Sequence, residues 1–225
     1  MDKFIEKLCK SSLGNLPYAS DLGNQVELPS EVYKKLMLIK DYTKKDGRER
    51  ALNVYVAFNE LIATDHTIGT NENVKTNDKI SLRMEPNGDK YFNKIVEIND
   101  KVYLKKKESL ADFNKMDRNI YSTMTFHTHP LHDEYNFKTW GFFSDIDINS
   151  LVSAKSLPSM GLVTKSIWLL VKVRSSDNPD VKEYSSLYHS LYNADIPNYQ
   201  PLIDYLNAHG LAVFHSEGSV ILKRR

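Results

Sequence analysis

Two histidines separated by a single residue stand near the middle of the chain and are followed by a proline. They are His127 and His129, in the run FHTHP. Side chains alternate across a β-strand, so residues two positions apart leave the same face of the strand. Imidazole nitrogens are good ligands for divalent metals, and catalytic zinc has three protein ligands and one open position. The pair is therefore predicted to form part of a metal site.

A carboxylate that could complete such a site follows at Asp147, in the run SDID that begins at Ser144. We expect this run to open a helix, which would place Asp147 in the first turn. The same pattern is typical of a capping box, in which an N-terminal serine and an acid three residues later bind free amide groups of the helix. The residue types alone allow either role for Ser144 and Asp147.

The two runs together, His127-Thr128-His129-Pro130 and Ser144-Asp145-Ile146-Asp147, resemble the signature of the JAMM (MPN-plus, or JAB-domain) zinc metalloprotease family. The resemblance covers residues 28–174, where the order of the expected helices and strands is also similar to that family. It implies that His127, His129 and Asp147 bind Zn²⁺ and that Ser144 helps to hold the oxyanion.

The resemblance also implies a glutamate near the start of an upstream strand, which takes a proton from the water that attacks the amide. Glu49 holds this position, between a long predicted helix and the strand expected at residues 51–58. The alternative is that Glu49 is a solvated acid beside Arg48 and Arg50. The other candidates for the base are Glu60 and Glu85.

The remaining segments read as a mixture of helices and strands. Helices are expected at residues 3–10, within 28–47 (with Ser30 as N-cap and Gly47 at the C-terminal end), 144–157, 181–195 and 197–210. Strands are expected at residues 51–58, 60–67, 78–84, 90–98, 101–107, 120–130, 166–173, 211–216 and 219–223. The strand at residues 166–173 is nearly all apolar, which indicates a central place in a sheet.

This order of elements predicts an α/β (α+β) fold with a mixed β-sheet flanked by helices. The resemblance implies a JAB/MPN-like domain with the three layers of a cytidine-deaminase-like fold. Residues 1–27 are expected to be an N-terminal helix and connection, and residues 28–225 a single domain with insertions at about residues 68–118 and 131–143. The second insertion carries aromatic residues that could be a small core or a wall facing substrate. They are Tyr135, Phe137, Trp140, Phe142 and Phe143.

Composition narrows the functional class. The 30 Lys and Arg against 29 Asp and Glu give a net charge of +1, which argues against a nucleic-acid partner bound by bulk charge. A single cysteine, Cys9, excludes an internal disulfide framework and a thiolate-rich zinc site. No apolar run approaches the roughly 20 residues of a membrane span, and the first residues lack the apolar core of a secretory signal. A soluble, cytoplasmic protein without a membrane partner is the resulting expectation.

The expected function is hydrolysis of amide or isopeptide bonds with Zn²⁺ as cofactor. The resemblance implies a ubiquitin-like protein or a peptide tail as the substrate, bound as an extended strand. The alternative is a catalytically inactive MPN-type scaffold or interaction module. The sequence leaves the oligomeric state open.

Overall fold

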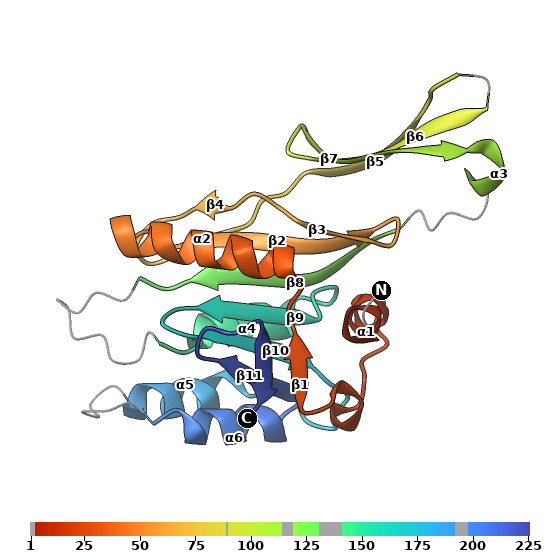
Figure 1. The fold of residues 1–225 in the computed structure, drawn as a ribbon. Coiled ribbons are helices and arrows are strands. Elements are labelled where there is room, and N and C mark those ends of the chain that lie inside the picture. The colour runs from red at the N-terminus through yellow and green to blue at the C-terminus, as the bar shows by residue number, and fades with distance from the viewer. Residues whose placement is uncertain (1–2, 89, 114–118, 131–140, 192–197) are drawn as a thin grey trace.

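A large mixed β-sheet runs through the molecule (Figure 1), in a computed structural model that describes residues 3–88, 90–113, 119–130, 141–191 and 198–225. Within these residues the strand order is β1-β12-β11-β10-β9-β8-β2-β3, and β4 pairs with β2. The pair β8 and β9 is parallel, and the other neighbours are antiparallel. The strands are β1 (Gln25–Glu27), β2 (Arg50–Ala57), β3 (Glu60–Ala63), β4 (Thr67–Ile68), β8 (Ile120–Thr128), β9 (Ser159–Val163), β10 (Ile167–Lys172), β11 (Leu211–Ser216) and β12 (Ile221–Arg224).

Helices cover both faces of this sheet, which confirms the predicted mixed sheet flanked by helices. On β10, Leu169 and Val171 pack into one core with the apolar faces of α1 and α2, whereas Trp168 and Leu170 pack into a second core with α4, α5 and α6. This alternation is the period-two pattern of a strand buried on both sides. The helices are α1 (Lys3–Ser12), α2 (Ser30–Asp46), α4 (Asp145–Ser153), α5 (Val181–Ser190) and α6 (Gln200–Ala208), with two short turns, η1 (Ala19–Leu22) and α3 (Leu110–Phe113).

The long helix α2 ends where the sequence predicts and begins slightly earlier. Gly47 adopts φ 69°, a left-handed conformation, and donates its N–H to the carbonyl of Thr43. Glycine carries no Cβ that would strain this conformation, so it is the favoured residue at a helix C-terminus. The expectation that Ser30 is the N-cap is wrong. Ser30 is the first helical residue, because the chain turns into the helix at Pro29.

The segment after α4 differs from the expectation. The predicted helix at residues 144–157 ends at Ser153, and residues 159–163 form β9, for which no strand was predicted. Pro158 disfavours a helical conformation at the residue before it, so the helix cannot continue into this segment. Gly161 of β9 packs directly against the ring of Phe126 on β8, which leaves no space for a Cβ at that position. The stretch is a strand because its neighbours bury it.

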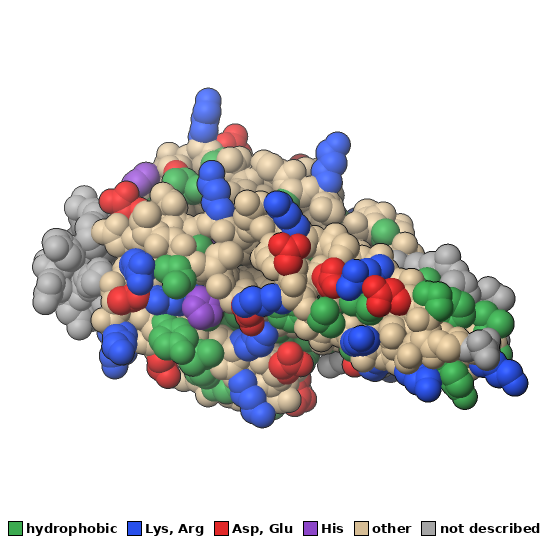
Figure 2. All heavy atoms as spheres, turned by 90° about the horizontal axis from the view of Figure 1, so that it is seen from above, with side chains coloured by type: hydrophobic (Ala, Val, Ile, Leu, Met, Phe, Trp, Pro, Cys, Tyr) green, Lys and Arg blue, Asp and Glu red, His purple; other side chains and the backbone are tan. Residues whose placement is uncertain are grey.

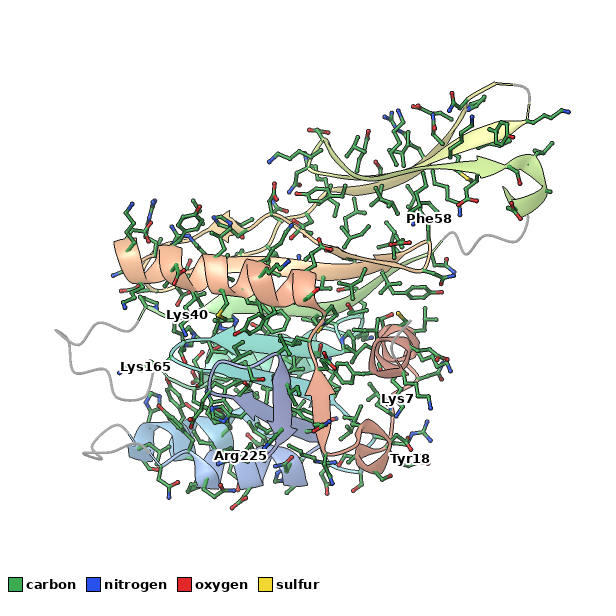
Figure 3. The ribbon with its side chains drawn as sticks, viewed as in Figure 1. Lys7, Tyr18, Lys40, Phe58, Lys165 and Arg225 are labelled. Carbon is green, nitrogen blue, oxygen red and sulfur yellow. The ribbon has the colours of Figure 1, made fainter. Side chains whose placement is uncertain are left out.

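A second sheet extends away from the main body (Figure 1) and contains β5 (Ile80–Pro86), β6 (Tyr91–Ile98) and β7 (Lys101–Ser109). It falls within the first predicted insertion. The hairpin between β6 and β7 turns at Asn99 and Asp100, with φ of 54° and 62°, as an Asn-Asp turn favours. Phe58 lies where the β2–β3 hairpin meets this sheet, and its ring centroid is 5.1 Å from Lys94 Nζ (Figure 3).

Basic and acidic side chains are interspersed on the face seen from above in Figure 2. This mixture matches the near-zero net charge of the chain. None of the helices that the structure describes is both long and apolar enough to cross a membrane.

Candidate metal centre

The two histidines meet at the end of β8. The strand ends at Thr128, and His129 follows directly, so the expected strand over residues 120–130 is two residues shorter. The Nε2 atoms of His127 and His129 lie 3.2 Å apart, on one face as the spacing predicts. Both residues are buried.

Asp147 reaches this pair from the first turn of α4. Its Oδ1 lies 3.2 Å from Nε2 of His127, and its Oδ2 lies 3.5 Å from Nε2 of His129. The three side chains therefore bring nitrogen and oxygen donor atoms within 4.8 Å of one another. This largely buried group could hold a metal ion.

The capping box considered for Ser144 and Asp147 is present, and it holds the same carboxylate in place. The backbone N–H and the hydroxyl of Ser144 both donate to Asp147 Oδ2 at 2.8 Å, while the backbone N–H of Asp147 donates to Ser144 Oγ at 3.2 Å. Helix capping and orientation of Asp147 toward the histidines are thus compatible roles. The oxyanion role of Ser144 stays a prediction.

The charge state of Asp147 suits a metal ligand. Burial opposes ionisation of this carboxyl group, but the neighbouring His127 and His129 outweigh that effect and hold its pKa well below the ordinary value. An ionised carboxylate is the form that binds a cation, and metal sites require their ligands to be deprotonated.

Glu49 lies directly before β2, the strand that pairs with β8. In the β2–β8 ladder Ala51 pairs with His127, and the same register extended by two residues sets Glu49 opposite His129. Its backbone is fixed by hydrogen bonds to residues 69 and 70, at 2.9 and 2.7 Å. The helix-to-strand junction therefore places Glu49 beside the histidines.

The environment of Glu49 is that of a buried acid. Its exposed fraction is 5%, and the neighbouring Arg48 and Arg50 both pair with Asp46. Burial raises the pKa of Glu49 to about 7, with Asp147 and Glu72 adding to the effect and His129 opposing it. A carboxyl group with a pKa near neutrality can both accept and return a proton.

The fallback bases lie elsewhere. Glu60 begins β3 and pairs with Lys106 of the second sheet, and Glu85 lies on β5 beside Arg83 at 3.3 Å. Neither is among the described residues that surround the metal group.

A cleft of about 560 Å³ opens over the His127, His129 and Asp147 group. Its floor consists of alternate residues of β2, such as Ala51 and Asn53, together with the histidine face of β8. One wall is the first turns of α4, and the other is the segment of residues 72–76. The three proposed ligands, Glu49 and Ser144 therefore share one solvent-accessible space.

Sequence reasoning missed the polar floor of this cleft. Asn53 donates to Asp78 Oδ2 at 2.7 Å, and the Tyr55 hydroxyl donates to the same oxygen at 3.2 Å. A signal was present, because Asn53 interrupts the apolar run of a buried strand at the same period-two positions as Glu49 and Ala51.

The aromatic residues before α4 belong in part to the core. Phe142 and Phe143 are fully buried, and the ring of Phe143 lies 6.3 Å from that of His127 in an edge-on arrangement. These two residues therefore support the site from beneath rather than facing substrate. Tyr135, Phe137 and Trp140 lie outside the described residues.

Comparisons with known proteins assign no family to the chain. No protein-family model matches the chain, and neither a curated protein nor a solved structure matches it.

The raised pKa of Glu49 leads to a stability prediction for the metal-free protein. A carboxyl group whose pKa rises on folding binds its proton more tightly in the folded state, so stability falls as the pH rises from about 4.5 to about 7. Glu49→Gln removes this penalty. We expect the variant to be more stable than the wild type by roughly 1 to 3 kcal/mol at pH 8 and nearly equal to it at pH 4.5.

Thermal unfolding in a metal-chelating buffer at both pH values measures this difference. Glu60→Gln is the matched control, because it makes the same chemical change at an exposed site. If Glu49→Gln raised the stability equally at both pH values, the burial of the charged carboxylate would not be the cause of the gain in stability.

Proposed function

We propose that the chain is a zinc-dependent hydrolase of amide or isopeptide bonds of the JAMM type. The observation that carries the proposal is that the buried Glu49 lines the same cleft as the group of His127, His129 and Asp147. A metal-binding group without a base would suit a structural site. A buried carboxylate that faces the same cleft as that group suits hydrolysis.

The donor set favours zinc. Two imidazole nitrogens and one carboxylate oxygen are a ligand set found in catalytic zinc sites. Such sites leave one coordination position open. Bonds of about 2.0–2.2 Å in a tetrahedral arrangement place ligand atoms roughly 3.3 to 3.5 Å apart. The two Nε2 atoms lie 3.2 Å apart, close to this range, and each of them lies 3.2 or 3.5 Å from a different carboxylate oxygen of Asp147.

The residues of the cleft have separate roles in the proposed reaction. A metal ion held by His127, His129 and Asp147 would lower the pKa of a water molecule and polarise the scissile carbonyl group. Glu49 accepts a proton from the attacking water and returns it to the leaving amine. The Ser144 hydroxyl donates a hydrogen bond to the developing oxyanion. To do so, it must turn away from Asp147 Oδ2, its present partner at 2.8 Å.

The layered architecture supports a JAB/MPN-like, cytidine-deaminase-like three-layer domain over residues 28–225. The helix α2, the strand after Glu49, the histidine strand β8 and the Asp147 helix α4 follow one another in the order that the resemblance implies. In this interpretation β5, β6 and β7 are an insertion, and residues 1–27 are an N-terminal addition.

A peptide tail is the substrate class that we propose, with a ubiquitin-like protein as its carrier. The cleft extends from the metal group along β2 to Tyr55, and its floor near the metal is formed by the small side chain of Ala51. A cleft that follows a strand in this way suits an extended peptide chain. The proposal includes a cytoplasmic location, and it includes neither nucleic acid nor a membrane as a partner.

Hydrolysis tests this proposal directly. We expect the purified chain to cleave peptide- or isopeptide-linked substrates that end in a ubiquitin-like tail, to lose this activity in a strong chelator, and to regain it with added Zn²⁺. A protein that binds zinc but cleaves none of a panel of such tails and small amides would instead be an inactive scaffold of the same fold.

A further inference from the structure

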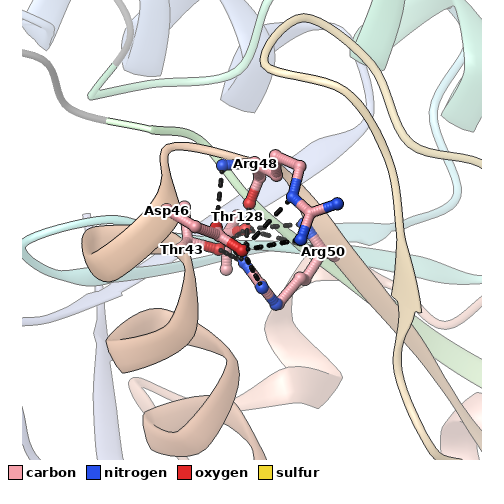
Figure 4. A network of polar contacts seen from close by, with 5 residues as sticks. All are labelled: Thr43, Asp46, Arg48, Arg50 and Thr128. Atoms are coloured by element: carbon pink, nitrogen blue, oxygen red, sulfur yellow. Dashed lines mark hydrogen bonds and ion pairs between the residues drawn. The ribbon is translucent and has the colours of Figure 1, made fainter.

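A network of polar side chains joins the end of α2 to β2 and β8 (Figure 4). Its members are Thr43, Asp46, Arg48, Arg50 and Thr128. We propose that this network positions His127 and His129 by fixing the end of β8 against β2 and α2. The inference rests on the metal site proposed above and assigns a role to residues that do not themselves contact the metal.

Thr128 is the central member because it lies between the two histidines and points to the opposite face. Its Oγ1 accepts the backbone N–H of Arg50 at 2.9 Å and lies 2.7 Å from Oγ1 of Thr43 on α2. The side chain is fully buried. One hydroxyl therefore joins the histidine strand to the strand of Glu49 and to the last turns of α2.

Arg50 ties this hydroxyl pair to the end of α2. Its two terminal nitrogens donate to the two carboxylate oxygens of Asp46 at 2.8 and 2.6 Å, and Nη1 also donates to the backbone carbonyl of Arg48 at 2.9 Å. The exposed fraction of Arg50 is only 4%. Burial of a paired charge usually contributes little net stability. The bidentate pair of Arg50 with Asp46 instead fixes the geometry of the strand start against the helix end.

The end of β8 needs such support. The β2–β8 ladder ends at the pair Ala51 and His127, and the β8–β9 ladder ends at Thr128 and Val163. His129 lies beyond both ladders, so the side-chain bonds of Thr128 hold the backbone immediately before it. Partners that orient a metal ligand without touching the metal typically contribute 10- to 100-fold to metal affinity.

The test compares two threonines on one strand. Thr128→Val removes the network hydroxyl and keeps the branched shape. Thr123→Val is the matched control, since Thr123 is also fully buried on β8 and its hydroxyl donates to Val54 O of β2 at 2.8 Å, four residues before His127. Both variants lose buried hydrogen bonding between β8 and β2, and Thr128→Val also loses the contact with Thr43. A merely structural role therefore predicts that any loss of metal affinity follows the loss of thermal stability in both variants.

The measured quantities are the Kd for Co²⁺, read from its visible absorption spectrum, and the thermal midpoint of the full chain without metal. We expect Thr128→Val to weaken Co²⁺ binding by about tenfold or more and to change the spectrum. Both variants should lower the thermal midpoint, but Thr123→Val should change the Kd by less than twofold. Thr128→Ser, which restores the hydroxyl, should recover most of the affinity.

Three results would contradict the inference. Equal Kd changes in Thr128→Val and Thr123→Val would show that the network only stabilises the fold. If Thr128→Val does not fold, Thr43→Val removes the same contact from the α2 side, and an unchanged Kd there would overturn the inference. Failure of the wild-type chain to bind Co²⁺ or Zn²⁺ would overturn the metal site itself and this inference with it.

Discussion

Replacement of any one of His127, His129 and Asp147 by alanine is expected to reduce bound zinc from about one ion per chain to nearly none. Two remaining protein donors are too few for a stable site, and a water molecule cannot replace a buried ligand without a large loss of affinity. Metal analysis after exhaustive dialysis measures the effect. Full occupancy in any of the three variants would refute the ligand assignment.

The Asp147 position allows a sharper comparison, because its carboxylate also caps α4. Asp147→Asn keeps an oxygen that can accept the Ser144 N–H, so it should preserve the helix while removing the anionic ligand. Asp145→Asn is the matched control. Asp145 lies two residues away, and its carboxylate accepts a hydrogen bond from Ser185 of α5 at 2.7 Å rather than facing the histidines. We expect zinc loss in the first variant and full zinc in the second.

Glu49→Gln is expected to reduce hydrolysis by about two to four orders of magnitude while zinc stays bound, the range that a positioned acid-base group contributes. Glutamine keeps the size and hydrogen-bonding reach of the side chain but cannot accept the proton. Rates under saturating substrate, together with the zinc content of the same preparation, measure both parts of the prediction.

Glu60→Gln is the control for this experiment and should retain full activity, since Glu60 pairs with Lys106 away from the cleft. Loss of activity in Glu60→Gln but not in Glu49→Gln would move the base to position 60. Unchanged activity in both variants would mean that hydrolysis, where observed, does not use the proposed mechanism.

Local patterns predicted most of the elements that hold the site. The spacing of His127 and His129 predicted a shared face because a strand has a side-chain period of two, and the structure has both Nε2 atoms 3.2 Å apart. The serine and aspartate at the start of α4 allowed either a helix cap or a metal-ligand role, and the geometry accommodates both. The apolar run of β10 predicted its central place, between β9 and β11.

Features that depend on distant residues could not be predicted in the same way. The strand β9 is short and contains Gly161, and it is a strand only because β8 and β10 pair with it. Arg50 reads as a surface charge beside Arg48 and Glu49, yet it is buried against Asp46. The raised pKa of Glu49 depends on its burial by residues that are distant in the sequence. The residues next to Glu49 along the chain therefore could not predict it.

The most direct test of the central claim is anomalous diffraction at the zinc absorption edge, from crystals of the full chain grown with Zn²⁺. We predict one strong peak within bonding distance of His127 Nε2, His129 Nε2 and a carboxylate oxygen of Asp147, with the Glu49 carboxylate nearby but not bound to the metal. The absence of a peak at these three residues, or a peak with Glu49 as a ligand, would contradict the proposed catalytic zinc site.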